Sequence, residues 1–122
     1  MKIAITSMGR TLDSEVDQRF GRAAYFLIVE TETLDYSAIE NESVAAAVGA
    51  GISSAKALVD AGAEAVLTGN CGPNGQRTLS AAGIKLYTGV AGTVREAVEK
   101  FKSGKLTETT GPNVQAHFGL GD

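Results

Sequence analysis

Apolar runs in the first 40 residues predict three strands. Residues 2–7 alternate loosely between apolar and polar positions, and residues 25–29 are continuously apolar, which predicts a strand buried on both faces. Residues 36–40 also alternate, and the turn residues before them favour a third strand antiparallel to the second. The polar segment 8–24 is a long loop, and such loops in compact domains are usually functional or poorly ordered.

Helical spacing begins at residue 52. Ile52, Ala55 and Leu58 lie on one side of a predicted helix, which Gly62 ends. Thr93 and Glu96 have the spacing of a capping box, which predicts the start of another helix. The elements expected after the first helix are a strand over 65–67, a helix over 76–82, a strand over 84–87 and a helix from Thr93 to Gly104.

Strands that alternate with helices predict an α/β domain. Such strands run parallel and are joined by right-handed crossovers, so one antiparallel strand near the N-terminus makes the expected sheet mixed, with helices covering it. Ligands in these open sheets bind beyond the carboxyl ends of the parallel strands. We therefore expect one domain over residues 1–104, with its binding loops at one edge, and a loosely attached tail over residues 105–122.

Composition and charge narrow the possible functions. The 122 residues are 43% hydrophobic and 20% charged, as in a single globular domain. The net charge of -3 and the absence of a Lys/Arg run argue against binding to nucleic acid or to a membrane surface. One cysteine cannot form an internal disulfide, and no signal peptide or long apolar span is evident, so we expect a cytoplasmic protein that can be a monomer.

Three glycine-bearing turns each precede a predicted helix. Unpaired N–H groups at a helix start, together with the helix dipole, favour an anion without any basic side chain. Glycine is also needed for left-handed turn geometry, so the turns alone do not establish binding. The candidate binding residues are Gly49 and Gly51 in the first turn, Gly69, Asn70, Cys71, Gly72 and Asn74 in the second, Gly92 and Thr93 in the third, and Arg22 in the loop before them.

Soft metal ligands are few in this sequence. Cys71 is a candidate thiolate ligand, because a helix start lowers the pKa of a thiol, and the alternative is a small apolar filler in a tight turn. His117 is a second candidate metal ligand, although a solvated histidine near the chain end is the ordinary interpretation. Met8 is a soft donor that ordinarily caps a strand.

The loop over residues 8–24 carries charged residues of both signs. Asp13, Glu15 and Asp17 invite a calcium hypothesis, but the glycine and glutamate of a calcium-binding loop are absent, which favours a solvated loop. The guanidinium group of Arg22 is expected to approach an anion bound where the loops meet, whereas Phe20 is expected to anchor the loop in the core.

The order and spacing of several short motifs resemble the dinitrogenase iron-molybdenum cofactor biosynthesis family over roughly residues 2–104. The resemblance implies a ribonuclease H-like fold, a five-stranded mixed sheet with the second strand antiparallel, and binding or carriage of metal-sulfur cluster precursors. The motifs are Lys2-Ile3-Ala4-Ile5, Phe20-Gly21-Arg22-Ala23, Gly49-Ala50-Gly51, Gly69-Asn70-Cys71-Gly72-Pro73-Asn74, Ala82-Gly83-Ile84 and Gly92-Thr93-Val94.

The function expected from these features is non-catalytic. We expect a carrier for an anionic iron-sulfur or molybdenum-containing cluster, or its precursor, that passes it to a cluster-assembly or cluster-receiving protein. A nuclease is disfavoured because the first strand carries no carboxylate for a two-metal site. The alternatives are a small protein or enzyme that binds a phosphate ligand, and an interaction module without cargo. Phosphate-binding motifs and a nucleophile with its base are absent from the sequence.

Overall fold

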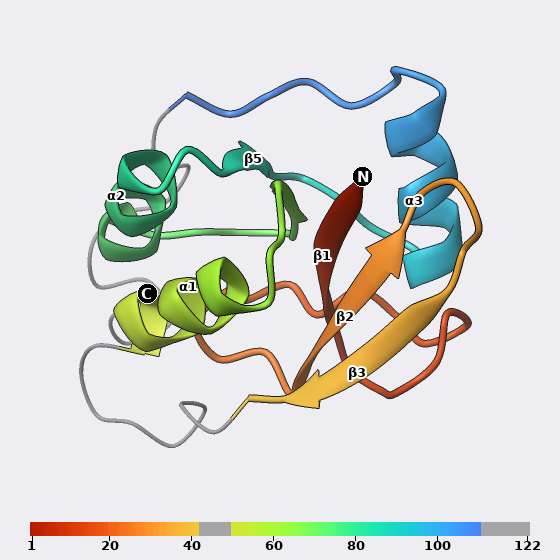
Figure 1. Cartoon of the computed structure of the whole chain (residues 1–122), viewed down its shortest axis with the longest axis horizontal. Coiled ribbons are helices and arrows are strands. Elements are labelled where there is room, and N and C mark those ends of the chain that lie inside the picture. The colour runs from red at the N-terminus through yellow and green to blue at the C-terminus, as the bar shows by residue number, and fades with distance from the viewer. Residues whose placement is uncertain (42–49, 111–122) are drawn as a thin grey trace.

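Five strands and three helices make up the domain (Figure 1). The computed structural model describes residues 1–41 and 50–110. The strands are β1 (Lys2–Ser7), β2 (Tyr25–Glu30), β3 (Tyr36–Glu40), β4 (Ala65–Leu67) and β5 (Lys85–Tyr87), and the helices are α1 (Ala50–Asp60), α2 (Pro73–Ala81) and α3 (Val94–Lys102). All the expected elements are present, although α1 and α2 begin two and three residues earlier than predicted.

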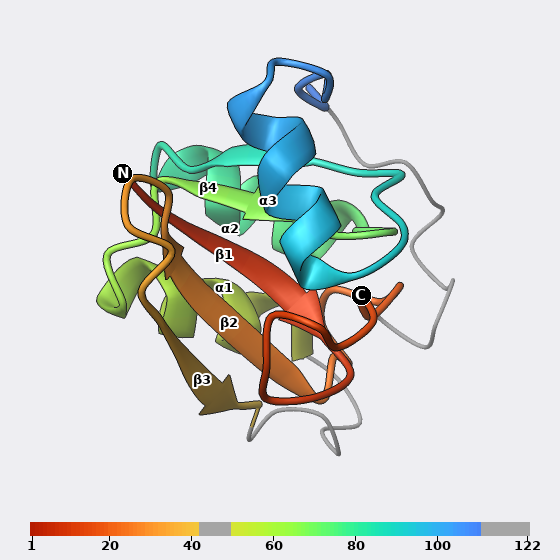
Figure 2. The same ribbon diagram turned by 90° about the vertical axis from the view of Figure 1, so that its right-hand side faces the viewer.

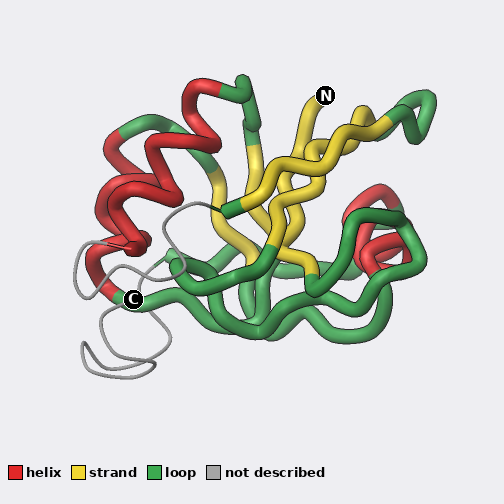
Figure 3. Tube along the Cα trace, turned by 90° about the horizontal axis from the view of Figure 1, so that it is seen from below, coloured by secondary structure: helices red, strands yellow, loops and turns green. Residues whose placement is uncertain are grey.

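The sheet is mixed and has the order β3-β2-β1-β4-β5. β2 is antiparallel to both of its neighbours, whereas β1, β4 and β5 are mutually parallel. The prediction of a five-stranded sheet with an antiparallel second strand is therefore confirmed. Because β3 also runs in the direction of β1, four strands end at the same edge, and Figure 3 shows loops gathered beneath that end.

Helices cover both faces of the sheet, as expected (Figure 2). α1 and α2 pack on one face through Ala55, Leu58 and Leu79. α3 packs on the other face through Val94 and Val98, together with part of the loop after β1. None of the helices in the described part of the chain is long and apolar enough to cross a membrane.

The capping box of α3 is confirmed. Glu96 N–H donates to Thr93 Oγ1 over 3.1 Å, and Thr93 N–H donates to Glu96 Oε1 over 2.9 Å. The hydrogen bond from the Thr93 backbone, followed by the contact with its side chain, lowers the pKa of Glu96 below its usual value of 4.5. A lowered carboxyl pKa contributes stability above pH 4.5, which is lost as the pH falls through the folded-state value.

Removal of this cap is expected to have a moderate effect on stability. Thr93→Ala should lower the free energy of unfolding by about 1 kcal/mol, because the N–H group of Glu96 loses its side-chain acceptor. Urea unfolding of the variant and the wild type measures the difference. Ser103→Ala at the other end of α3 is the control, and an equal loss there would contradict the role of the cap.

The C-terminal segment is attached more closely than the sequence predicts. Residues 105–110, which we call the C-terminal strap, lie along the outer edge of β5. Thr109 N–H donates to Leu86 O over 2.7 Å, and Thr88 N–H donates to Thr109 Oγ1 over 3.2 Å. Leu106 also packs against the core beneath α3. The prediction of a loose tail is therefore wrong for residues 105–110, and residues 111–122 lie outside the described part.

Candidate functional site

Three loops meet at the carboxyl edge of the sheet and are joined by backbone hydrogen bonds. The loop after β1 joins the second glycine turn, because Asn70 N–H donates to Gln18 O over 2.8 Å. The same loop joins the third turn through Val16 N–H and Gly92 O, 2.9 Å apart. Gly89 N–H donates to Gly69 O over 2.8 Å, which links the second and third turns. The expected convergence of these loops is confirmed.

Phe20 anchors the loop after β1, as predicted. Its side chain is fully buried, and its ring centroid lies 6.0 Å from that of Phe26 on β2. Gly75 in the first turn of α2 lies directly against it, since a Cβ at that position would be 3.0 Å from the Phe20 ring. Phe20 therefore holds the loop and the start of α2 together.

The buried carboxylate of Asp17 holds the backbone of the loop after β1 by hydrogen bonds. Its side chain is 8% exposed, and its carboxylate accepts hydrogen bonds from the backbone N–H groups of Arg19 and Ala24 at 3.1 and 3.2 Å. Thr6 Oγ1 lies 2.7 Å from the backbone oxygen of Asp17. The expectation of a solvated acidic loop is wrong for Asp17. The described residues contain no group of three His, Cys, Asp or Glu side chains that could hold a metal ion.

The described part of the first glycine turn, Ala50 and Gly51, is packed against the loop after β1. A Cβ on Gly21 would lie 2.9 Å from Gly51 N, so the two backbones touch. Asn41 Nδ2 donates to Gly21 O and Ala23 O over 3.1 and 2.8 Å, which fixes this contact from beneath. Gly51 thus has a packing role that the sequence did not reveal, and Gly49 lies outside the described residues.

The third glycine turn has no open amide groups at the start of α3. Val94 N–H donates to Ser14 O over 2.9 Å, and Arg95 N–H donates to Leu12 O over 2.8 Å. The amides of Thr93 and Glu96 are used by the capping box. The prediction that this turn offers free donors is therefore wrong, because the loop after β1 supplies acceptors for it. Gly92 and Thr93 can contribute to a site only through other atoms.

The second glycine turn does leave donors open. Gly72 is the N-cap of α2 and provides no side-chain cap, Pro73 has no N–H group, and the first turn contains no acid. Gln76 N–H donates back to Gly72 O over 3.1 Å. Within residues 1–41 and 50–110, the N–H groups of Asn74 and Gly75 have no acceptor. This turn therefore has the features of an anion site.

Arginine side chains add positive charge around the α2 turn. Arg77 Nη2 donates to Asn74 Oδ1 over 2.6 Å at an exposed position. Arg19 is exposed, and its backbone pairs with that of Asn70. Arg22 is half-buried and follows Gly21. Guanidinium groups bind anions through several N–H donors, so Arg77, which contacts Asn74 in the first turn of α2, complements the open amides.

Cys71 lies beneath this turn and not on its surface. The residue is fully buried in the apolar cluster that includes Phe20 and Leu79, and its Sγ lies 3.6 Å from Gly72 O. A Cβ on Gly75 would be 3.1 Å from this sulfur. These contacts favour the small apolar filler, and a thiolate ligand would need the turn to open.

Burial predicts that Cys71 reacts slowly with thiol reagents. We expect an aromatic disulfide reagent to modify the native protein about a hundredfold or more slowly than the urea-unfolded protein, because reaction requires local opening. Absorbance of the released thiolate measures both rates. Native and unfolded rates that agree would place the sulfur at the surface and favour a direct ligand role.

Two further candidates lie away from the α2 turn or outside the described chain. Met8 is 63% exposed just after β1, so it does not cap the strand by burial. His117 lies outside the described residues.

Gly69 is buried and contacts the loop after β1, since a Cβ there would be 2.8 Å from Gln18 Cα. Gly69 therefore positions the second turn by close backbone approach.

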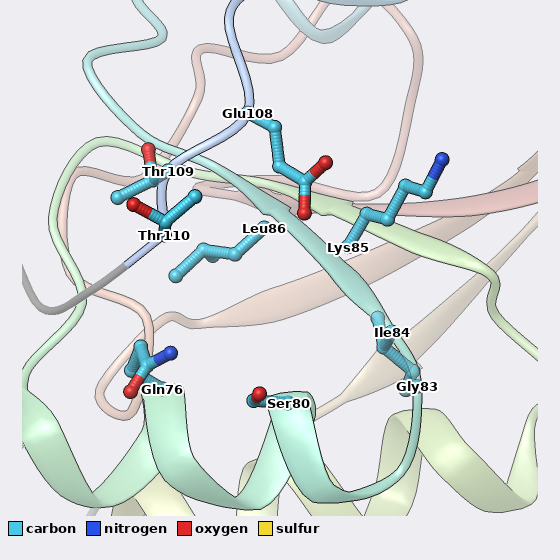
Figure 4. A pocket seen from close by; sticks show the side chains of 9 residues that line it. All are labelled: Gln76, Ser80, Gly83, Ile84, Lys85, Leu86, Glu108, Thr109 and Thr110. Carbon is cyan, nitrogen blue, oxygen red and sulfur yellow. The ribbon is translucent and has the colours of Figure 1, made fainter.

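A cavity that the sequence did not indicate lies between α2, β5 and the C-terminal strap (Figure 4). Its volume is about 260 Å³, with Leu86 at its base and polar groups of Ser80 and Glu108 on opposite sides. Its lining residues are Gln76, Ser80, Gly83, Ile84, Lys85, Leu86, Glu108, Thr109 and Thr110. None of the glycines predicted to bind an anion lines it.

Comparison with solved structures supports the family resemblance. The orange protein of Desulfovibrio gigas, solved in its apo form, is 41% identical, with 93% of this chain and 96% of that chain covered and a TM-score of 0.90. A Thermotoga protein described as a candidate NifB protein of the DUF35 family is 42% identical, with coverages of 89% and 93% and a TM-score of 0.79.

Sequence comparison agrees with the structural match. An uncharacterized protein of Methanocaldococcus jannaschii is 27% identical over 110 residues, which span 87% of this chain and 93% of the relative. The family model described as dinitrogenase iron-molybdenum cofactor matches residues 1–104, which include β1 to α3. The chain therefore belongs to the dinitrogenase iron-molybdenum cofactor family.

Proposed function

We propose that this protein is a non-catalytic carrier that binds an anionic iron-sulfur or molybdenum-containing cluster, or its precursor, and passes it to a cluster-assembly or cluster-receiving protein. The observation that carries the proposal is the uncapped first turn of α2, at the edge where three loops converge. Asn74 and Gly75 present N–H groups there, and the helix dipole adds to their attraction for negative charge.

The donors around this turn suit an anionic metal-sulfur cluster. Sulfide atoms on the surface of a cluster accept hydrogen bonds, and such bonds are among the ways a protein tunes a cluster. The N–H groups of Asn74 and Gly75 would supply these bonds, and the guanidinium groups of Arg22 and Arg77 would balance the charge. Cys71 would become a ligand only if the turn opened, because its sulfur is buried.

The relatives support a cluster as the cargo. The family description names an iron-molybdenum cofactor, and one structural relative is an orange protein solved in an apo form. Inorganic phosphate would bind to the same amide groups. The cargo must therefore be identified by comparing anions that are alike except that sulfur replaces oxygen.

We propose binding without catalysis, and the residues at this edge support it. β1 supplies no carboxylate, and the buried carboxylate of Asp17 accepts hydrogen bonds from backbone amides.

We also propose that the domain is a monomer and that it has a ribonuclease H-like fold. We propose the cytoplasm as its compartment, where a single thiol stays reduced. The sheet with an antiparallel second strand supports the fold assignment.

Anaerobic reconstitution tests the carrier function. The purified protein is incubated with iron and sulfide, or with thiomolybdate, then desalted and examined by elemental analysis and visible absorption. We expect stoichiometric metal and charge-transfer bands. A colourless, metal-free protein under every condition would contradict the proposal. Cys71→Ser is the informative variant: retention lost in a folded Cys71→Ser protein would assign the thiolate as a ligand, and unchanged retention would support the amide and arginine cradle.

A further inference from the structure

The two edges of the sheet differ in how they are covered. The outer edge of β5 is occupied by the C-terminal strap, through the hydrogen bond from Thr109 N–H to Leu86 O. β3 forms the opposite edge, and no residue within 1–41 or 50–110 pairs with its outer side (Figures 1 and 2). An uncovered strand edge is a template for another strand.

The register of β3 shows which backbone groups face outward. Glu30 N–H donates to Asp35 O, and Asn41 N–H donates to Ala24 O. Bonded pairs alternate in an antiparallel ladder, so Ser37 and Ile39 also bond to β2. The N–H and C=O groups of the alternate residues, Tyr36, Ala38 and Glu40, therefore point away from the sheet.

β3 lacks most of the features that protect an edge, apart from the acids at its ends. Its sequence, Tyr36 to Glu40, contains no lysine, no proline and no glycine, and its register with β2 is continuous, without a bulge. Tyr36 is 43% exposed. The strand is therefore a regular, accessible edge that can pair with an extended segment.

A groove beside β3 offers space for side chains of an added strand. Its volume is about 400 Å³, and Ile28, Ile39 and Ala61 form its apolar part on the α1 face of the sheet. Charged groups of Lys2, Glu30 and Asp35 and the residues Tyr36 and Ser37 complete its lining. Alternate side chains of an added strand would extend over this groove, as in other complexes formed by strand addition.

The charge around β3 identifies the kind of partner. Residues 23–41 contain four acids and no lysine, arginine or histidine. Glu30 is held by the N-terminal amine at 2.6 Å, and Glu40 lies 3.6 Å from Arg10 in an exposed ion pair. Among the described residues, Glu32 and Asp35 have no ion-pair partner. Lys2 lines the same groove as Asp35 and offsets one of these two charges, so the edge presents a small excess of negative charge.

This charge disfavours a second copy of the chain as the partner. Antiparallel pairing of β3 with itself about Ala38 would place Glu40 of each copy opposite Tyr36 of the other. Such a pairing would also bring the acids of two like-charged edges close together, and repulsion between like charges disfavours it. Asp35 and Glu40 lie on opposite faces of the strand, because they are five positions apart, so a segment with Lys or Arg on both faces would pair with them.

We propose that β3 is a docking edge for an extended, basic segment of another protein, which adds to the sheet as a sixth strand. The segment would hydrogen-bond to Tyr36, Ala38 and Glu40, and its basic side chains would face Glu32, Asp35 and Glu40. The proposal does not depend on the cargo, because the docking strand and the open α2 turn are separate features.

Defined peptides test this edge. The probe is a peptide of about ten residues, long enough to span a strand, in which lysines on both faces are separated by threonine and valine. The control peptide has glutamate in place of lysine. We expect the lysine peptide to protect the amides of Tyr36, Ala38 and Glu40 from hydrogen exchange, with weaker binding at higher salt. The glutamate peptide should not bind.

Two variants separate edge pairing from non-specific attraction. Ala38→Pro removes one outward N–H without removing a bond to β2, and should weaken binding by about tenfold or more. Glu40→Lys should weaken it by about two- to fivefold. Glu99→Lys on α3 makes the same charge change elsewhere and should leave binding unchanged. Circular dichroism confirms that each variant is folded.

Several results would overturn the docking edge. They are failure of the lysine peptide to bind, equal binding to Ala38→Pro, and protection of amides outside β3. Concentration-dependent protection of β3 in the protein alone would also overturn it, because the edge would then pair with a second copy.

Discussion

Phe20→Ala is expected to lower the free energy of unfolding by about 3–5 kcal/mol, the largest stability effect that the fold predicts. The side chain is fully buried and lies between the loop after β1, the first turn of α2 and Phe26. Its removal would leave a cavity beneath the site, and surrounding backbone is held by too many hydrogen bonds to collapse fully. Urea unfolding measures the loss.

Phe101→Ala is the matched control for this prediction. Phe101 is half-buried on α3 and contacts Tyr87 edge-on, with ring centroids 5.3 Å apart, so its truncation exposes less buried surface. The loss should be clearly smaller than for Phe20→Ala. Equal losses in the two variants would mean that Phe20 has no special role in anchoring the loop.

Asn74→Asp is expected to have the largest effect on cargo binding. The new carboxylate would lie in the first turn of α2, where it would accept from the open amides and repel an anionic cluster. Retention should fall by about tenfold or more, since like charges a few ångströms apart repel strongly near a protein surface. The same carboxylate should stabilise the helix by about 0.3–1 kcal/mol, because it complements the helix dipole.

The opposite signs of these effects make the variant informative. A merely damaged protein would lose both stability and cargo, whereas a cargo site at the start of α2 predicts a more stable protein that retains less cluster. Thr33→Asp, in the turn after β2 at the opposite edge of the sheet, adds the same charge as a control. Loss of retention in both variants would indicate a general charge effect, and unchanged retention in Asn74→Asp would place the cargo elsewhere.

Local sequence patterns predicted the elements and their directions well. The continuous apolar run of β2 reflects burial on both faces, and the capping residues of α3 bond to each other across only three positions. Strand direction followed from the alternation of strands and helices. These features depend on residues near one another in the chain, so the pattern contains the information.

The candidate site was only partly predictable, because contacts between distant residues decide it. Helix starts alone could not show that carbonyl groups of Leu12 and Ser14 occupy the amides of α3, while those of Asn74 and Gly75 have no acceptor among the described residues. The burial of Cys71 depends on Phe20, which is 51 positions away in sequence and adjacent in space.

The attachment of the C-terminal strap was missed for a related reason. Its segment is polar and carries no periodic pattern, so composition indicated a loose tail. Its contacts with β5 use the backbone of Thr109 and the paired hydroxyls of Thr88 and Thr109, 2.8 Å apart. Backbone pairing at an edge leaves little signal in the choice of side chains.

Amide chemical shifts during titration with thiomolybdate test the central claim most directly, with molybdate as the sulfur-free control. We predict that the largest shifts occur at Asn74 and Gly75, that thiomolybdate binds more tightly than molybdate, and that Asn74→Asp removes the response. Shifts confined to the α3 turn, or to the cavity between α2 and the C-terminal strap, would contradict a cargo site at the start of α2.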